Sequence, residues 1–138
     1  RARPEFAEAL AFLDSKEGLF LRDVIKSGEV EWGFAAELGG HLIQGQIDLW
    51  GRDAGGQLWV VDYKTGIPEK VESALRQLEI YAWALMRIGK ITAGESVRLA
   101  AVFPFHGRVV SRQFDKYLSL ESQLKKMVLD LGPSFVSR

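Results

Sequence analysis

The chain has 138 residues, of which 47% are hydrophobic and 26% are charged. This balance is typical of a folded globular protein and excludes an intrinsically disordered one. Basic and acidic residues both number 18, so the formal net charge is zero and no global basic field attracts nucleic acid. The absence of cysteine excludes disulfides, zinc–thiolate sites and iron–sulfur clusters.

The length and the first residues predict one domain cut from a larger protein. A chain of this length typically forms a single domain, which we expect over residues 1–138. It begins with arginine and opens directly into helix-like sequence, so we expect a fragment of a longer chain. No apolar run reaches the roughly 20 residues that span a bilayer, and residues 1–4 lack the apolar core of a secretory signal. We therefore expect a bacterial cytoplasmic protein with no membrane partner.

The spacing of apolar residues predicts helix, helix, three strands, helix, two strands and helix, in that order. The expected bounds are helices 4–14 and 17–26, strands 30–38, 41–50 and 58–61, a helix from after Pro68 to about 88, strands 96–104 and 108–114, and a helix 115–131. The third strand is apolar on both faces, which predicts the centre of the sheet. The order predicts an α/β fold, a central mixed sheet flanked by helices.

Local chemistry adds three expectations. Gly28 is expected to close the second helix in the left-handed conformation. Gly39–Gly40 is expected to form a tight turn between the first two strands. In the second strand, simple alternation places Ile47 and Leu49 on one face and Asp48 on the other.

An acid and a base follow the third strand on one face of the sheet. Alternation places Asp62 and Lys64 on the same face as Val60. Burying either charge without a partner is costly, so the two form a salt bridge at the rim of the sheet or take part in chemistry. The Asp-x-Lys pattern alone leaves both interpretations open.

Asp48 lies near the end of the preceding strand, where hairpin pairing can set it beside Asp62. Two carboxylates held together repel each other unless a proton or a cation lies between them. Hard oxygen ligands suit Mg²⁺, which keeps several waters when one or two carboxylates bind it. The alternative is a surface acid beside the turn that follows at residues 51–53.

The helix after Pro68 carries Gln77 and Tyr81, which are spaced i,i+4 and therefore lie on one face. They can face the same cleft as the acids. Read singly, Tyr81 is also typical of a boundary residue with a hydrated hydroxyl, and Gln77 of a solvated helix position.

Three motifs in this order carry a resemblance to a known family. Gly45-x-x-Asp48, then Val61-Asp62-Tyr63-Lys64-Thr65-Gly66, then Gln77-x-x-x-Tyr81 resemble the RecB-type nuclease domain of the PD-(D/E)xK superfamily, which forms the C-terminal nuclease domain of RecB- and AddA-like helicase–nucleases. The resemblance spans about residues 31–88. It implies a restriction-endonuclease-like fold that cleaves DNA phosphodiesters with Mg²⁺ or Mn²⁺.

The resemblance also implies a role for each matching position. Asp48, Asp62 and the backbone carbonyl of Tyr63 would bind the metal. Lys64 would orient or help to deprotonate the attacking water and stabilise negative charge on the phosphate, and Gln77 and Tyr81 would shape the site or contact DNA. The protein would act as an exonuclease rather than an endonuclease, in DNA end processing and recombinational repair. Its partners would be DNA, fused or associated helicase domains and a second helicase–nuclease subunit.

One feature of the family is missing. Relatives commonly supply a metal-binding histidine from a helix before the first strand, and this chain has none there. Its two histidines, His41 and His106, are both expected in turns. We expect that the missing helix precedes Arg1 in the intact protein; alternatively, this member never had it.

Two further hypotheses follow. The fold can be a catalytically impaired module for DNA-end binding or subunit docking, as the missing histidine suggests. It can also be an unrelated α/β domain with surface ion pairs, in which case Asp48 and Asp62 point apart.

Overall fold

The computed structural model describes residue 15 and residues 18–131. The helix predicted over residues 4–14 lies outside the described residues. The elements are α2 (Leu19–Ser27), β1 (Glu29–Leu38), β2 (His41–Arg52), β3 (Leu58–Tyr63), η1 (Pro68–Lys70), α3 (Val71–Arg87), β4 (Val97–Phe103), η2 (Pro104–His106), β5 (Arg108–Phe114) and α4 (Tyr117–Leu131). Every element predicted within the described residues is present, with ends shifted by a few residues.

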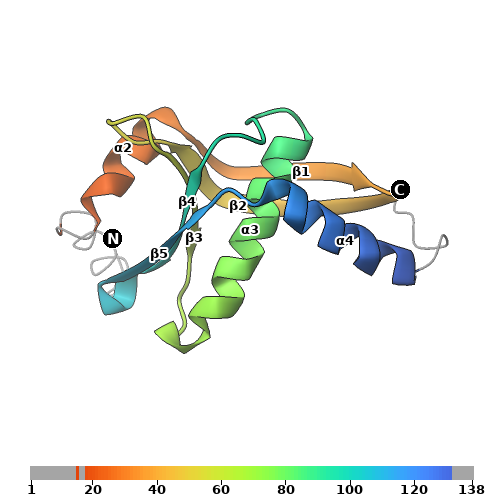
Figure 1. The fold of residues 1–138 in the computed structure, drawn as a ribbon. Helices are drawn as coiled ribbons and strands as arrows, with labels where there is room; N and C mark the ends of the chain where they lie inside the picture. Colours follow the sequence, from red (N-terminus) through yellow and green to blue (C-terminus); the bar gives the residue numbers. More distant parts are fainter. Residues whose placement is uncertain (1–14, 16–17, 132–138) are drawn as a thin grey trace.

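The five strands form one mixed sheet in the order β1-β2-β3-β4-β5 (Figure 1). Neighbours are antiparallel except β3 and β4, which are parallel because α3 carries the chain back between them. β3 is the central strand, as its two apolar faces predict. The α/β architecture with a helix-flanked mixed sheet is confirmed.

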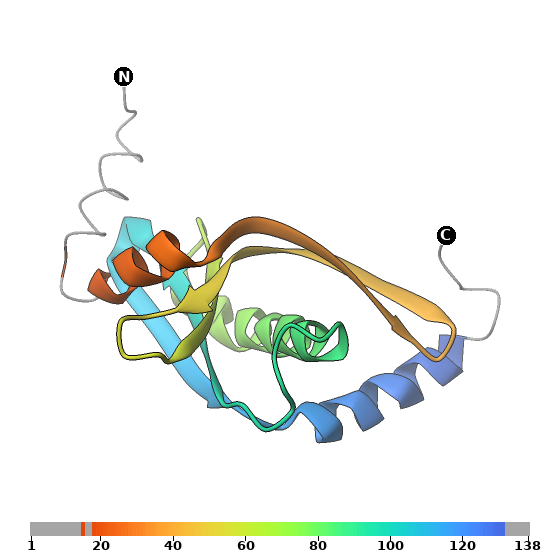
Figure 2. The same ribbon diagram turned by 90° about the horizontal axis from the view of Figure 1, so that it is seen from above.

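The sheet has an apolar core on each face. Val60 belongs to a large core with residues of α3 and α4, whereas its neighbour Val61 belongs to a smaller core with residues of α2. Successive residues of a strand point to opposite faces, so α3 and α2 cover opposite faces of the sheet. Figure 2 shows α3 between the curved β1–β2 hairpin and α4.

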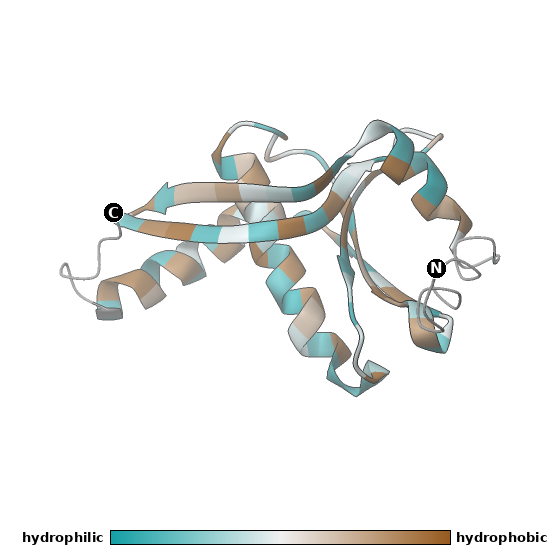
Figure 3. Cartoon of the chain, turned by 180° about the vertical axis from the view of Figure 1, so that it is seen from behind, coloured by the Kyte–Doolittle hydropathy of each residue, from teal (hydrophilic) through white to brown (hydrophobic). Residues whose placement is uncertain are grey.

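Alternation along β2 is interrupted at Asp48, contrary to the prediction. Ile47 packs in the α3-side core, but Leu49 packs in the α2-side core, so the two do not share a face. Opposite this point, Glu31 adopts a positive φ of 48° and the β1–β2 pairing is interrupted between Trp32 and Val30. The alternation along β2 reverses at this point, so Asp48 lies on the α3 side, together with Ile47. The hydropathy bands along β1 and β2 are visible from behind in Figure 3.

Gly28 ends α2 by close approach and not by the predicted left-handed conformation. Its φ of −105° and ψ of −170° are extended. A Cβ on Gly28 would lie 2.3 Å from the carbonyl oxygen of Trp50, and one on Gly51 would lie 2.6 Å from the Cα of Gly28. The two glycines therefore let the end of α2 contact β2 directly.

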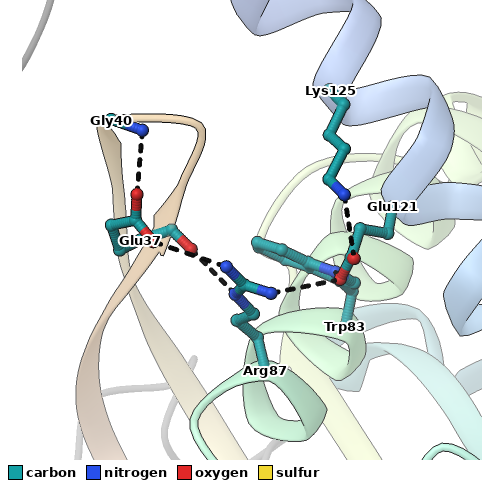
Figure 4. A network of polar contacts seen from close by, with 6 residues as sticks. All are labelled: Glu37, Gly40, Trp83, Arg87, Glu121 and Lys125. Atoms are coloured by element: carbon teal, nitrogen blue, oxygen red, sulfur yellow. Dashed lines mark hydrogen bonds and ion pairs between the residues drawn. The ribbon is translucent and has the colours of Figure 1, made fainter.

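A polar network anchors the far end of the β1–β2 hairpin to α3 and α4 (Figure 4). Arg87 Nε donates to the carbonyl oxygen of Glu37 at 2.8 Å, and the guanidinium lies 3.8 Å from Glu121 Oε1. Trp83 Nε1 donates to the same Glu121 oxygen at 2.9 Å, and Lys125 lies 3.7 Å from its other oxygen. The network contains two acids and two cations, so its charges balance.

The hairpin turn itself is the predicted one. Gly39 and Gly40 have φ values of 60° and 82°, which favour glycine. His41 is not in this turn, contrary to the prediction, but is the buried first residue of β2, paired with Leu38. No helix among the described residues is long and apolar enough to cross a membrane.

Candidate active site

Asp48 and Asp62 meet where β2 and β3 separate. The β2–β3 pairing ends at Leu49 with Val61, so the next residues along the same register are Asp48 and Asp62. Asp48 Oδ2 accepts a hydrogen bond of 2.8 Å from the backbone N–H of Tyr63, which fixes the carboxylate against β3. The structure therefore brings the two acids together, which contradicts the hypothesis that they point apart.

Asp62 is a nearly buried acid, and one positive charge offsets only part of the negative charge that it carries together with Asp48. It is 9% exposed, and Lys64 Nζ lies 2.8 Å from its Oδ2 as an ion pair. The same Oδ2 is buried, and the Lys64 ammonium offsets its charge. Asp48, Asp62 and Lys64 together carry two negative charges and one positive charge.

The surroundings of Asp62 shift its titration toward the neutral form. Burial and the neighbouring Asp48 raise the pKa of Asp62 to about 6, and the Lys64 ammonium opposes this rise. The folded state therefore holds a proton on this acid pair well above the ordinary range of an aspartate. A divalent cation can take the place of that proton, because it satisfies both carboxylates at once.

The α3 helix places Tyr81 and Gln77 over the acids. Burial raises the pKa of Tyr81, and the charges of Asp62 and Asp48 raise it further, while hydrogen bonding with Gln77 lowers it. The Tyr81 ring also packs edge-on against Phe34, with centroids 5.4 Å apart. The two motif residues of α3 therefore belong to the same site as the acids.

Side-chain packing explains why the first residue of the Gly45-x-x-Asp48 motif is glycine. A Cβ at this position would lie 2.8 Å from the Phe34 ring and 3.1 Å from the Tyr81 ring. Only a residue without a side chain lets the two rings close over β2 next to Asp48. Sequence reasoning identified Gly45 as a motif residue without this cause.

Lys64 is held in place by the sheet. Its backbone N–H donates to the carbonyl oxygen of Val102 at 2.8 Å, which continues the parallel β3–β4 pairing past the end of β3. Neither histidine joins the site: among residues 15 and 18–131, no group of three or more His, Cys, Asp or Glu side chains gathers as a metal site. The donor set that fits a metal consists of the two carboxylates of Asp48 and Asp62, with Lys64 Nζ 2.8 Å from the Oδ2 of Asp62.

A cavity of about 600 Å³ adjoins the acids at Lys64. We call it the α3 cleft. Its lining includes Lys64, Ile67, Lys70, Ser73, Gln77 and Phe103. Sequence reasoning missed Ile67, Ser73 and Phe103 as site residues; the signal for Ser73 was its spacing of four residues from Gln77, which puts both on one face of α3.

The mixed sheet presents one acid and an Asp-x-Lys motif at neighbouring strand ends. The sequence profile of the PD-(D/E)XK nuclease superfamily matches residues 5–129, and the chain belongs to this superfamily. Its fold is accordingly the restriction-endonuclease-like one that the sequence predicts.

Other comparisons add less. The crystal structure of SSO0001 is similar at 22% identity with a TM-score of 0.48, and the match covers 88% of this chain. The chain spans 55% of the length of that protein. No curated protein matches the sequence.

Proposed function

We propose that this chain is a divalent-metal-dependent deoxyribonuclease that hydrolyses phosphodiester bonds. The observation that carries the proposal is the close pair of Asp48 and Asp62 with Lys64 Nζ 2.8 Å from Asp62. In a family of nucleases, an acid pair with one unbalanced negative charge is suited to bind a cation.

Each residue has a role in this proposal. Asp48, Asp62 and the backbone carbonyl of Tyr63 would hold Mg²⁺ or Mn²⁺, which would supply Lewis acidity for the activation of water. Lys64 orients the attacking water and offsets charge on the phosphate oxygens. The water oxygen bonds to phosphorus and releases a proton to solvent, the bond to the leaving ester oxygen breaks, and that oxygen takes a proton from solvent.

Gln77 and Tyr81 complete the site from α3. The pKa of Tyr81 responds to both acids, which supports its position over them. Its hydroxyl and the Gln77 amide are suited to hydrogen-bond a phosphate oxygen or the metal-bound water, so that the substrate is oriented for attack.

The zero net charge supports a partner that delivers DNA. We propose that the chain is one domain of a bacterial cytoplasmic helicase–nuclease of RecB type, which works as an exonuclease in DNA end processing and recombinational repair beside a second helicase–nuclease subunit. Circular and linear single-stranded DNA distinguish an exonuclease from an endonuclease, because an exonuclease needs a DNA end and does not cleave the circular strand.

The direct experiment uses linear single- and double-stranded DNA with Mg²⁺ or Mn²⁺. Asp62→Ala is expected to abolish cleavage, and Asp130→Ala, which removes an exposed acid of α4, to leave it unchanged. Cleavage that survives Asp62→Ala would contradict the proposal, because the activity would belong to a contaminant.

A second candidate is a catalytically impaired module for DNA-end binding or subunit docking. The lack of a metal-binding histidine beside the two acids favours it. A metal that binds only the folded state raises stability, by about 2.7 kcal/mol at a hundred times its Kd. A thermal unfolding midpoint unmoved by millimolar Mn²⁺ would therefore support this second function.

A further inference from the structure

The α3 cleft has a volume in the range of small-ligand sites. Its 600 Å³ lies within the roughly 300–1,000 Å³ of pockets that bind drug-sized molecules. Such a volume holds one nucleotide but not a duplex. Because Lys64 lines it, the cleft opens directly beside the acid pair.

One face of the α3 segment runs from the cleft to the acids. Ser73, Gln77 and Tyr81 follow at intervals of four residues, which places them in one row along α3, and Lys70, the last residue of η1, lies at the start of this helix. Gln77 lines the cleft together with Lys64, whose ammonium lies 2.8 Å from Asp62. A DNA strand bound at the acids would therefore continue along this row of side chains.

The charges of the cleft suit a phosphate. Its lining includes Lys64 and Lys70 and no acid among the described residues. The acids of α3 lie elsewhere: Glu72 and Glu79 each lie 3.2 Å from Arg112 of β5. Within the described part of the chain, Lys70 has no ion-pair partner, whereas Lys64 pairs with Asp62. The Lys70 ammonium is therefore available to an incoming anion.

The cleft also has an apolar wall. Phe103 is 2% exposed and forms part of the core beneath it, whereas Ile67 is 54% exposed at its rim. An exposed isoleucine beside two lysines offers a surface to a sugar or a base while the lysines hold its phosphate.

We propose that the α3 cleft binds the nucleotide next to the cleaved phosphodiester, with Lys70 and Ser73 on that nucleotide's phosphate and Ile67 against its sugar or base. This inference rests on the proposed nuclease function. It makes Lys70 a substrate-positioning residue, separate from the groups that carry the chemistry.

The test is a cycle between Lys70→Ala and the phosphates of a short single-stranded oligonucleotide, each replaced in turn by a neutral methylphosphonate. Lys70→Ala is expected to raise KM about tenfold, to change kcat less than about twofold and to reduce the salt slope of binding by about 1. Replacement of the one phosphate adjacent to the cleaved bond should raise the KM of the wild type. The same replacement should have little further effect on the KM of Lys70→Ala. Lys126→Ala serves as control, because it removes the same charge from an exposed position of α4 that lies away from the cleft.

The outcomes separate the two proposals. An unchanged KM in Lys70→Ala, or effects that add at every phosphate, would overturn the role of the cleft while cleavage by the wild type leaves the nuclease intact. If the wild type binds DNA without cleaving it, the nuclease proposal fails, and the same cycle measured on Kd by fluorescence anisotropy decides the cleft. If it does neither, both proposals fall.

Discussion

Two acid clusters lie along α3, one near its C-terminal end and one beside its middle, and they differ in how their negative charges are compensated. Near its C-terminal end, Glu37 and Glu121 are matched by Arg87 and Lys125, and Trp83 donates to Glu121. Toward the middle of α3, Asp48 and Asp62 have a single cation, Lys64, between them. The first cluster is balanced and the second is short of one positive charge.

The pKa values follow the same division. A backbone hydrogen bond from Gly40 lowers the pKa of Glu37, and Arg87 lowers it further. Burial and Asp48 raise the pKa of Asp62 to about 6. The first environment favours the ionised acid and the second disfavours it. We infer that the balanced cluster joins the hairpin to the helices, and that the unbalanced one is kept for a ligand that brings positive charge.

The largest effect is expected for Asp62→Asn. Loss of a carboxylate ligand should lower kcat/KM by at least about a thousandfold. Removal of a disfavoured charge should at the same time raise stability at pH 8, by about 1–3 kcal/mol. Cleavage rates and urea unfolding measure the two. A variant that is inactive and also less stable at pH 8 would contradict this account of the acid pair.

The gain in stability should depend on pH in a defined direction. The raised pKa of Asp62 means that the folded state binds the proton more tightly, so the wild type loses stability as the pH rises from about 4 through about 6. The difference from Asp62→Asn should therefore be absent at pH 4 and complete above pH 7. Urea unfolding across this pH range measures the difference in stability. A difference that grows toward low pH would contradict the raised pKa of Asp62.

Metal affinity should fall as the pH falls through about 6. Below this value the proton on Asp62 competes with the cation, so each further unit should lower the apparent affinity for Mn²⁺ about tenfold. Calorimetric titrations between pH 5 and 8 measure the trend. An affinity that does not vary over this interval would show that Asp62 is not a ligand.

Gly45→Ala should have a smaller effect. The new methyl group would force the Phe34 and Tyr81 rings apart, at a cost of about 1–3 kcal/mol, and should lower kcat by displacing Tyr81. Gly33→Ala is the matched control, since its Cβ would meet nothing nearer than 3.9 Å. Equal unfolding midpoints in urea for the two variants would contradict the packing role of Gly45.

The smallest effect on cleavage is expected in the balanced cluster. Arg87→Met removes the bond to the Glu37 carbonyl and should lower the free energy of unfolding by about 1–2 kcal/mol, with kcat/KM unchanged within about twofold. Urea unfolding and cleavage assays measure the two. A large loss of activity at unchanged stability would mean that the two clusters are coupled.

Regular patterns in the sequence carry the architecture. The alternation in β1 and β4 and the apolar stripe of α3 predict these elements because their periods match the structure that buries them. The central position of β3 follows in the same way from its two apolar faces. The meeting of Asp48 with Asp62 was also accessible, since a hairpin register brings them opposite each other.

Irregular features of the backbone escape the same reasoning. The positive φ of Glu31 reverses the alternation of β2, so the face of Asp48 cannot be counted from Ile43 or Ile47. The close approach of Gly28 to β2 depends on tertiary contact. The sequence alone does not show this contact, so Gly28 looks there like an ordinary helix-ending glycine. The α3 cleft arises from residues far apart in the chain, such as Ile67 and Phe103.

The most direct measurement is a double-mutant cycle on Mn²⁺ affinity with Asp48→Asn, Asp62→Asn and the double variant, and Asp130→Asn as control. If one cation joins the two acids, each single variant should weaken binding by at least about tenfold, and the double variant should lose much less than the product of the two. Losses that multiply, or no loss in either single variant, would contradict a shared metal site.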